Sequence, residues 1–445
     1  MSTTNESSTK QLKQVLGFRD LFSTAVGQII GSGIMTLLGI AIALTGRSVP
    51  LAFLVSTLLV VISSIPHILI TGTIRVRGGQ YTMVGMLAGK TMTGAFIILY
   101  IMSNISLAMY GISFASYFID FFGIGNSKMI ALLVLTIFFV LNLLGVDKMA
   151  KFQNIIVLLM CIALGLLAVF GVGRLQPDYF TNGFITNGVT GLLQAGSLLT
   201  FAIGGGYVVT NLSAEAKNPT RDIPLAIICA TLLVALIYAL ISIIAAGVLP
   251  VEQVAGKNLS LVAKEVLPSP AYTFFMVCGA MFALISTLNA QYAWATKPIL
   301  QACDDGWLPK KLAYLHPKYK TPVILLAILY GLAVISVVAD ISLSMLGNLS
   351  LIALSLTGLM VSANMWKLPK VVPEAWNHSK FKVGPGPLKI LVALCVGGAL
   401  FNIYMNMTQL SMALRIGNLV VIVAAFIFAF ARQSKVVMDT DYEER

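Results

Sequence analysis

The sequence predicts an all-α polytopic membrane protein with about 12 transmembrane helices. Of its 445 residues, 58% are hydrophobic and only 10% are charged, and the mean hydropathy is +0.91. A soluble domain carries about 25% charged residues, so this composition excludes an ordinary soluble fold. Two of the apolar stretches are interrupted by clusters of glycine. A break of this kind is tolerated at membrane depth only where it is buried in protein or lines a cavity.

The predicted spans are apolar stretches of about 20 residues, long enough to cross the hydrocarbon core. Their ends are accurate to within a few residues. In order, they cover residues 20–45, 48–73, 92–122, 128–146, 152–174, 192–214, 223–249, 269–300, 321–340, 343–366, 387–408 and 412–432. We therefore predict an N-terminal segment (1–18), one transmembrane domain (19–433) and a solvated C-terminal tail (434–445).

The net charge of +12 is explained by membrane topology. Most of the 29 Lys and Arg fall on loops that a cytoplasmic N-terminus would place inside. Lys297 lies within a span, and the outside loops hold Arg47, Lys128, Arg174, Lys257, Lys264 and Arg415. This positive-inside bias predicts a multi-pass protein of the cell membrane with both termini in the cytoplasm, and it leaves no reason to expect nucleic acid as a partner. Residues 1–18 lack the pattern of a cleaved signal peptide.

The reactive side chains do not form a catalytic or metal-binding pattern. The five cysteines (Cys161, Cys229, Cys278, Cys303 and Cys395) are scattered and have no CxxC spacing, as expected for packing residues. No set of His, Cys or carboxylate side chains has the spacing of metal ligands or of a catalytic triad. We predict no metal, no cofactor and no enzymatic activity. No filter-like loop is repeated along the chain, which argues against a channel.

The first glycine cluster occupies residues 26–34, Val-Gly-Gln-Ile-Ile-Gly-Ser-Gly-Ile. We expect the helix to stop near Ile29 and to restart near Ser32. The restarting half would present free N–H groups and the positive end of a helix dipole, which suit a carboxylate. Ser32 adds a hydroxyl, while Gly31 and Gly33 allow a ligand to approach the backbone closely.

The second cluster, residues 203–206, follows a half-helix that should end near Phe201. The free carbonyls of both breaks would attract an ammonium group, so the pair matches a dipolar amino acid. The breaks are about 175 residues apart, the length of five spans with their loops. This spacing predicts two five-span halves (20–174 and 192–366) in opposite orientation, an inverted repeat, followed by two further spans (387–432). The alternative for either break alone is a glycine notch at which helices pack closely.

The chain is similar to the amino acid–polyamine–organocation superfamily of transporters. Four motifs carry this resemblance, at residues 27–34, 78–81, 215–224 and 304–322. The superfamily includes arginine/agmatine exchangers and L-type amino-acid exchangers. The resemblance implies a leucine-transporter-like fold, with a five-plus-five inverted repeat in which helices 1 and 6 are broken.

The resemblance also implies roles for individual residues. Ser32 and Gly33 match the pair that holds the substrate carboxylate, with Gly31 beside them. Ile29 and Gly204 match residues whose carbonyls receive the substrate amine. Phe201 matches an aromatic gate that covers the substrate, and the alternative is a packing or lipid-facing residue.

Two residues depart from the pattern of the arginine/agmatine exchangers. Tyr207 stands in place of a glutamate, and Gln291 replaces a tryptophan that frames the cationic side chain. Asn104 matches an asparagine of the side-chain pocket, although an interhelical hydrogen bond explains it equally well. Relatives with a coupling lysine in span five have it where this chain has Met160. Tyr207 and Gln291 favour a neutral substrate, whereas Met160 argues against coupling through that lysine.

Other polar residues lie within the spans. Ser286 and Thr287 are placed where sodium-coupled relatives bind a cation, which makes them a candidate ion site, but such hydroxyls more often bond to their own helix. His67 follows Pro66 and is a functional candidate, or a neutral histidine bonded to the carbonyl that the proline frees. Lys297, near a span end, is expected to reach the interface.

We therefore predict a secondary transporter, a permease or exchanger of neutral L-amino acids that works by alternating access as a monomer or homodimer in the lipid bilayer. The alternative is an antiporter of amines or cationic amino acids, in which Phe201, Tyr207 and Tyr110 would enclose the amine.

Overall fold

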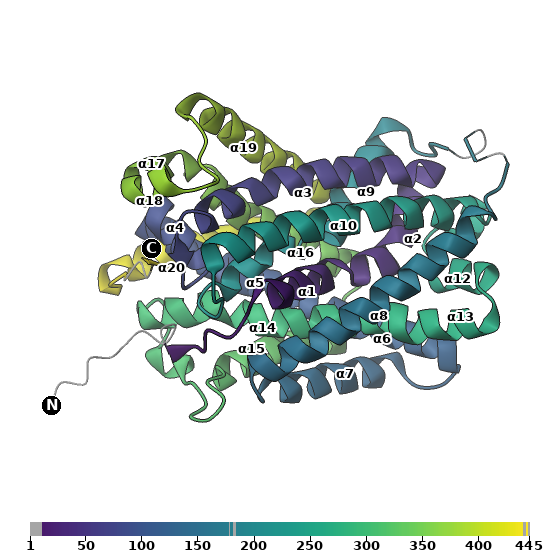
Figure 1. Ribbon diagram of the computed structural model, residues 1–445, viewed down its shortest axis with the longest axis horizontal. Helices are drawn as coiled ribbons and strands as arrows, with labels where there is room; N and C mark the ends of the chain where they lie inside the picture. The colour runs from purple at the N-terminus through teal and green to yellow at the C-terminus, as the bar shows by residue number, and fades with distance from the viewer. Residues whose placement is uncertain (1–10, 178, 181–183, 439–441, 444–445) are drawn as a thin grey trace.

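The computed structural model describes residues 11–177, 179–180, 184–438 and 442–443 as a bundle of helices that run along one long axis (Figure 1). The longer helices are α1 (Phe18–Ile29), α2 (Leu38–Thr45), α3 (Val49–Thr71), α4 (Gln80–Ala88), α5 (Lys90–Ser103), α6 (Leu107–Phe122), α7 (Ser127–Asn142), α8 (Val146–Val172), α9 (Gly188–Ile203), α10 (Pro219–Gly247), α14 (Phe282–Asp304), α15 (Val323–Val338), α16 (Leu343–Ser362), α19 (Pro385–Thr408) and α20 (Met412–Arg432).

Short elements connect or extend these helices. Two of them are π-helical, η2 (Gly33–Leu37) and η6 (Phe275–Met281), and two that matter here are 3₁₀ turns, η4 (Asn104–Ser106) and η5 (Gly206–Leu212). The remaining ones are η3 (Gly46–Ser48), α11 (Val251–Val254), α12 (Ser260–Val266), α13 (Ser269–Phe274), η7 (Lys310–Ala313), η8 (Met365–Lys367), α17 (Leu368–Val371), α18 (Pro373–His378) and η9 (Gln433–Lys435).

In the described part of the chain, nine helical stretches are long and apolar enough to cross a membrane. One of them, Phe18–Thr71, is 54 residues long and includes α1, α2 and α3. Two further apolar helices, α7 and α15, are shorter. The prediction of an all-α multi-pass protein is confirmed in this form, whereas the number of 12 crossings and the inverted repeat remain predictions.

Several helix ends follow directly from the sequence. The Asn126 side chain accepts hydrogen bonds from the first N–H groups of α7, and Ser342 does the same for α16, so orphan donors are satisfied. Gly123, with φ 69°, ends α6 in the left-handed conformation that glycine adopts without strain. Pro219 begins α10, where a missing N–H is no loss.

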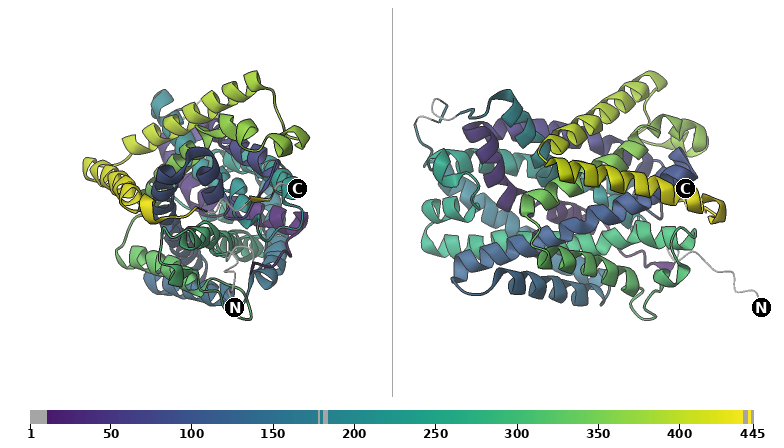
Figure 2. Two further views of the ribbon diagram at one scale, coloured as in Figure 1. Left: turned by 90° about the vertical axis from the view of Figure 1, so that its left-hand side faces the viewer. Right: turned by 180° about the vertical axis from the view of Figure 1, so that it is seen from behind.

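The interrupted helices occupy the middle of the bundle. Helix α1 packs against α8, α10 and α14, and α3 packs against α9 and α10. Helices α19 and α20 lie on the outside, as the end-on and rear views in Figure 2 show. They expose apolar side chains such as Leu394 and Ile416, as expected where lipid replaces water. Helix α19 also packs against α16 and α3, so one of its sides faces the interior.

Both ends of the described chain lie at one end of the bundle, which we call the terminal face (Figure 1). Strand β1 (Arg75–Val76) pairs antiparallel with β2 (Tyr442–Glu443). The Val436 side chain is buried, and the Val437 N–H donates to the Asp305 carbonyl at 3.2 Å. The described part of the tail therefore contacts the protein, and the solvated tail as a whole remains a prediction. The tail acids Asp439, Asp441 and Glu444 lie outside the described residues.

Candidate functional site

The first glycine cluster interrupts a helix, as the sequence suggested. Helix α1 ends at Ile29, Ile30 is extended (φ −81°, ψ 98°), and the chain resumes helical structure at Gly33 as η2. Ser32 lies at this restart and is 1% exposed. Among the residues that the structure describes, none forms a hydrogen bond with its hydroxyl. A buried hydroxyl without a partner is unfavourable unless a ligand completes it.

The carbonyls at the end of α1 are bonded by two neighbouring helices. The Thr287 hydroxyl of α14 lies 2.8 Å from the Gly27 carbonyl and 3.0 Å from that of Ile30. The Tyr238 hydroxyl of α10 donates to the Ile29 carbonyl at 3.0 Å. These bonds satisfy backbone groups that the interrupted helix leaves free, so they hold the break open.

The second glycine cluster interrupts α9 and lies against the first. Gly204 is extended (φ −63°, ψ 156°), Gly205 has φ +120°, and η5 follows. A Cβ atom on Gly33 would lie 2.3 Å from the Ala202 Cα, and one on Gly205 would lie 3.0 Å from the Gln28 Cγ. Glycine is therefore needed at the two places where the interrupted helices meet.

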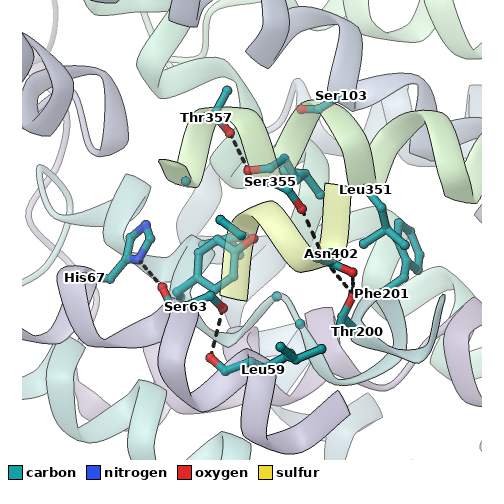
Figure 3. A pocket seen from close by; sticks show the side chains of 18 of the residues that line it. Leu59, Ser63, His67, Ser103, Thr200, Phe201, Leu351, Ser355, Thr357 and Asn402 are labelled. Atoms are coloured by element: carbon teal, nitrogen blue, oxygen red, sulfur yellow. Dashed lines mark hydrogen bonds between the residues drawn. The ribbon is translucent and has the colours of Figure 1, made fainter. Parts of the chain in front are cut away.

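A cavity of about 1050 Å³, part of it open to the outside, lies beside the two breaks. Its walls come from α1, α3, α4, α5, η4, α6, α9, η5, α14, α16 and α19, together with Gly204 and Gly205. Figure 3 labels some of the lining residues, among them Ser103 of α5 and Asn402 of α19. Among the described residues that line it, none is Asp, Glu, Lys or Arg. Because a buried charge requires a partner or a pKa change, this wall suits a ligand whose side chain is neutral.

In the wall formed by α1, η4 and α14, polar side chains are bonded to one another. The Trp294 indole donates to Gln28 Oε1 at 2.9 Å. Gln291 Nε2 lies 2.9 Å from both Asn104 Oδ1 and Ser106 Oγ. Asn104 is fully buried, does not line the cavity, and donates to the backbone of α5. Asn104 therefore accepts a hydrogen bond from Gln291 of another helix, which is one of the two roles that the sequence allowed for it.

The opposite wall contains a polar group of α19. Asn402 Nδ2 donates to the Thr200 hydroxyl at 3.1 Å and to the Ser355 hydroxyl at 3.2 Å. Figure 3 shows Asn402 between Thr200 of α9 and Ser355 of α16. Thr200 immediately precedes Phe201, so α19 is bonded to the helix that carries the predicted gate. The Phe201 ring faces the cavity, and its centroid lies 6.5 Å from that of Tyr110.

His67 and Tyr207 lie next to each other in the wall of the cavity. Their rings stack with centroids 4.6 Å apart. His67 Nδ1 lies 3.3 Å from the Ser63 carbonyl and Nε2 lies 3.1 Å from Gln80 Nε2 (Figure 3). Both contacts are satisfied by the neutral tautomer with hydrogen on Nδ1.

The carbonyl that Pro66 frees belongs to Ile62, four residues earlier. The Cys395 thiol of α19 lies 3.2 Å from this oxygen. The alternative in which His67 bonds the freed carbonyl is therefore wrong: His67 bonds the Ser63 carbonyl, and the freed carbonyl is bonded by Cys395. The sequence could not reveal the neighbour, because Cys395 comes from a helix more than 300 residues away.

Ser286 and Thr287, the candidate ion site, are both engaged by protein groups. Gln153 Nε2 of α8 donates to the Ser286 hydroxyl at 2.6 Å, and Gln153 Oε1 accepts from Asn289 at 3.0 Å. A Cβ on Gly27 would lie 1.9 Å from Gln153 Nε2. Gln153 is thus the side chain of α8 that reaches the first break.

Lys297 does not reach an interface as expected. Its ammonium lies 2.9 Å from Glu215 Oε1, and both side chains are about 95% buried. Glu215 follows η5, whereas Lys297 belongs to α14, so the ion pair joins two elements near the terminal face. This partner could not be predicted from the sequence, because the two residues are 82 positions apart.

The structure divides the predicted site residues into two groups. Phe201, Gly204, Tyr207 and Gln291 line the cavity. The others are buried and do not line it: Ile29, Gly31, Ser32, Gly33, Asn104, Ser286 and Thr287.

Sequence reasoning missed Gln28, Trp294 and the wall of α16 and α19. Trp294 follows Gln291 by three positions, a helical spacing that places both on one face and that could have revealed it. Asn402, a lone amide in an apolar stretch, was a comparable signal on α19.

Apolar helices around a cavity at two helix interruptions define a multi-pass membrane transporter. A model of the amino acid permease family matches residues 16–434, and the chain belongs to this family.

Characterised relatives come from Bacillus subtilis (strain 168). The chain is 27% identical to the branched-chain amino acid permease BcaP over 71% of its length and 72% of the relative's. It is 25% identical to the methylthioribose transporter (71% and 73%) and 24% identical to the serine/threonine exchanger SteT (73% and 76%).

Proposed function

We propose that this chain transports neutral L-amino acids across the cell membrane, as a permease or exchanger that works by alternating access. The substrate main chain binds at the two helix breaks, and its side chain enters the cavity. Ser32 and the N–H groups of the first break receive the carboxylate, and the carbonyls near Ile29 and Gly204 receive the amine.

The observation that carries this proposal is the cavity beside the two breaks, whose described lining includes no Asp, Glu, Lys or Arg. A cationic substrate side chain would need a carboxylate or a complete aromatic cage at this depth. The alternative of amine or cationic amino-acid exchange is not favoured for that reason. Two relatives support the same proposal, because the branched-chain amino acid permease BcaP and the serine/threonine exchanger SteT are both named for neutral amino acids.

Transport requires the cavity to open to one side at a time. We propose that the elements carrying the two breaks, with α3 and α10, move against α5, α6, α7, α14 and α15. Phe201 closes over the substrate during this movement. The distribution of Lys and Arg supports a cytoplasmic location for the terminal face.

The test begins with the melting temperature of the purified protein in detergent, measured with each standard amino acid and with the corresponding decarboxylated amines. A ligand that binds only the folded state raises this temperature. We expect shifts with neutral amino acids and none with the amines. Uptake of the stabilising amino acid into proteoliposomes, empty or loaded, then separates a permease from an exchanger. Stabilisation by amines alone, or no uptake of any neutral amino acid, would overturn the proposal.

A further inference from the structure

Two glycines in the wall of the cavity have room for a methyl group. Gly358 of α16 and Gly398 of α19 both line it. A Cβ atom on Gly358 would have no described atom within 4 Å. A Cβ on Gly398 would lie 3.5 Å from Ile62 Cγ2 and 3.7 Å from Leu59 Cδ2, which is ordinary van der Waals contact. Neither glycine is required by backbone conformation, because both lie inside helices with negative φ.

These positions contrast with the glycines of the two breaks. Gly33 and Gly205 are packed against protein atoms, so a methyl group there has no room. Helix interiors disfavour glycine by about 1 kcal/mol relative to alanine. Glycine at 358 and 398 therefore costs stability without relieving any backbone strain or clash, and what it provides is space on the cavity side.

We propose that Gly358 and Gly398 determine which substrate side chains are accepted, by leaving room for an aliphatic side chain of about the size of leucine between α3, α16 and α19. This inference rests on the proposed function. The wall formed by α1, η4 and α14 is more polar, because the Gln291 amide lies there and is bonded to Asn104 and Ser106.

The chemistry of this region selects aliphatic groups. Leu59, Ile62, Leu354 and Ala399 form its apolar surface. Asn402 bonds Thr200 and Ser355, so its amide hydrogens are already used. A hydrocarbon side chain gains about 25 cal/mol for each Å² that it buries, and a charged one has no counter-ion among the described lining residues.

The experiment compares uptake of leucine and alanine by proteoliposomes containing the full chain. The variants are Gly358→Ala, Gly358→Val and Gly398→Ala. In a hydrophobic pocket one methylene group changes discrimination by about 10- to 200-fold. We expect Gly358→Val to raise the KM for leucine by about tenfold or more, with a change of less than about twofold for alanine, and the two Ala variants to shift the ratio in the same direction.

Gly397→Val is the matched control, since Gly397 neighbours Gly398, has no described atom within 4 Å of its Cβ position, and does not line the cavity. It should leave the leucine/alanine ratio unchanged. The inference is overturned if the variants melt like wild type and transport both substrates with the wild-type ratio, or if Gly397→Val shifts the ratio as much. If wild-type protein carries no neutral amino acid, the proposed function itself fails, which is a different result.

Discussion

The Ser32 hydroxyl is buried without a partner among the described residues, at the point where the first interrupted helix restarts. If it binds the substrate carboxylate, Ser32→Ala removes a hydrogen bond to a charged group. Such a bond contributes about 1.5–3 kcal/mol, so affinity for every accepted amino acid should fall by about ten- to 150-fold. Competition against a labelled substrate in proteoliposomes measures this loss.

Ser56 of α3 is a matched control for this prediction. Its hydroxyl is also fully buried and also lacks a partner in the described part of the chain, but it lies inside α3 rather than at a helix break. Ser56→Ala should leave affinity unchanged. Equal losses in the two variants would show that Ser32 acts on packing rather than on the carboxylate.

Thr287 is expected to hold the first break rather than to bind a cation. Its hydroxyl hydrogen is directed to backbone carbonyls, and the Gln153 amide already bonds Ser286. Thr287→Val keeps the shape and removes the hydroxyl, which should destabilise the protein by about 1–3 kcal/mol. The melting temperature should fall, and replacing sodium by choline should not change wild-type uptake.

Thr210→Val serves as the control, because the buried Thr210 hydroxyl has no partner among the described residues. Uptake that requires sodium and is lost in Thr287→Val would instead support a cation site at Ser286 and Thr287.

Phe201 should affect movement more than binding, because it faces the cavity at the end of α9 while the proposed main-chain contacts lie at the breaks. For Phe201→Ala we expect exchange turnover to fall by about tenfold or more and the binding constant to change by only a few-fold. Counterflow and thermal-shift titration measure the two quantities. A large loss of binding with unchanged turnover would argue for a contact residue instead of a gate.

Single residues could be predicted where the backbone itself is unusual. Glycine and serine within an apolar run indicated the first break, and Ser32 and Gly33 lie where it restarts. The partner of a polar side chain could not be predicted in the same way. Asn104, Lys297 and Cys395 each bond a residue that is remote in sequence, so only the packing of helices decides what they contact.

At the scale of helices, the approach of η2 to α9 is set by one glycine. A Cβ at Gly33 would lie 2.3 Å from the Ala202 Cα, a backbone atom that cannot move aside alone. Gly33→Ala should therefore separate the two interrupted helices, at a cost of about 1–3 kcal/mol for an overpacked core, and abolish uptake. The measurement is initial uptake rate, normalised to the amount of folded protein recovered by gel filtration.

Gly165→Ala on α8 provides the comparison, since a Cβ at Gly165 meets no described atom within 4 Å. It should be active and at least as stable as wild type, because alanine favours the helix. Normal transport by Gly33→Ala would mean that the close contact between the breaks is not needed for function.

Helices could be located from the sequence, but their orientation could not. In a membrane protein the lipid-facing side and the cavity-facing side of a helix are both apolar, so periodicity does not separate them. The wall formed by α16 and α19 was missed for this reason, although Asn402 marks the inward side of α19. The two breaks could be predicted because clusters of glycine within an apolar stretch indicate them directly, without any need for an amphipathic pattern.

Across the whole molecule, the buried pair of Lys297 and Glu215 joins two parts that alternating access would separate. Lys297 belongs to α14, and Glu215 follows the second break. Removing one partner leaves an uncompensated buried charge, so Lys297→Met or Glu215→Gln should each destabilise the protein by about 3–5 kcal/mol. The double variant should recover most of that loss, as melting temperatures of the three proteins will show.

The same pair should restrain opening of the terminal face. When α14 and the segment after η5 separate, each of the two buried charges must be hydrated or must find a new partner. Cys303, fully buried at the end of α14, can report this opening. In a background with Cys303 as the single cysteine, the Lys297→Met/Glu215→Gln double variant should react with an impermeant maleimide about tenfold faster than the parent, equivalent to 1.4 kcal/mol lost from the closed state. A rate equal to that of the parent, in a double variant of parental stability, would show that the pair stabilises the fold without controlling access.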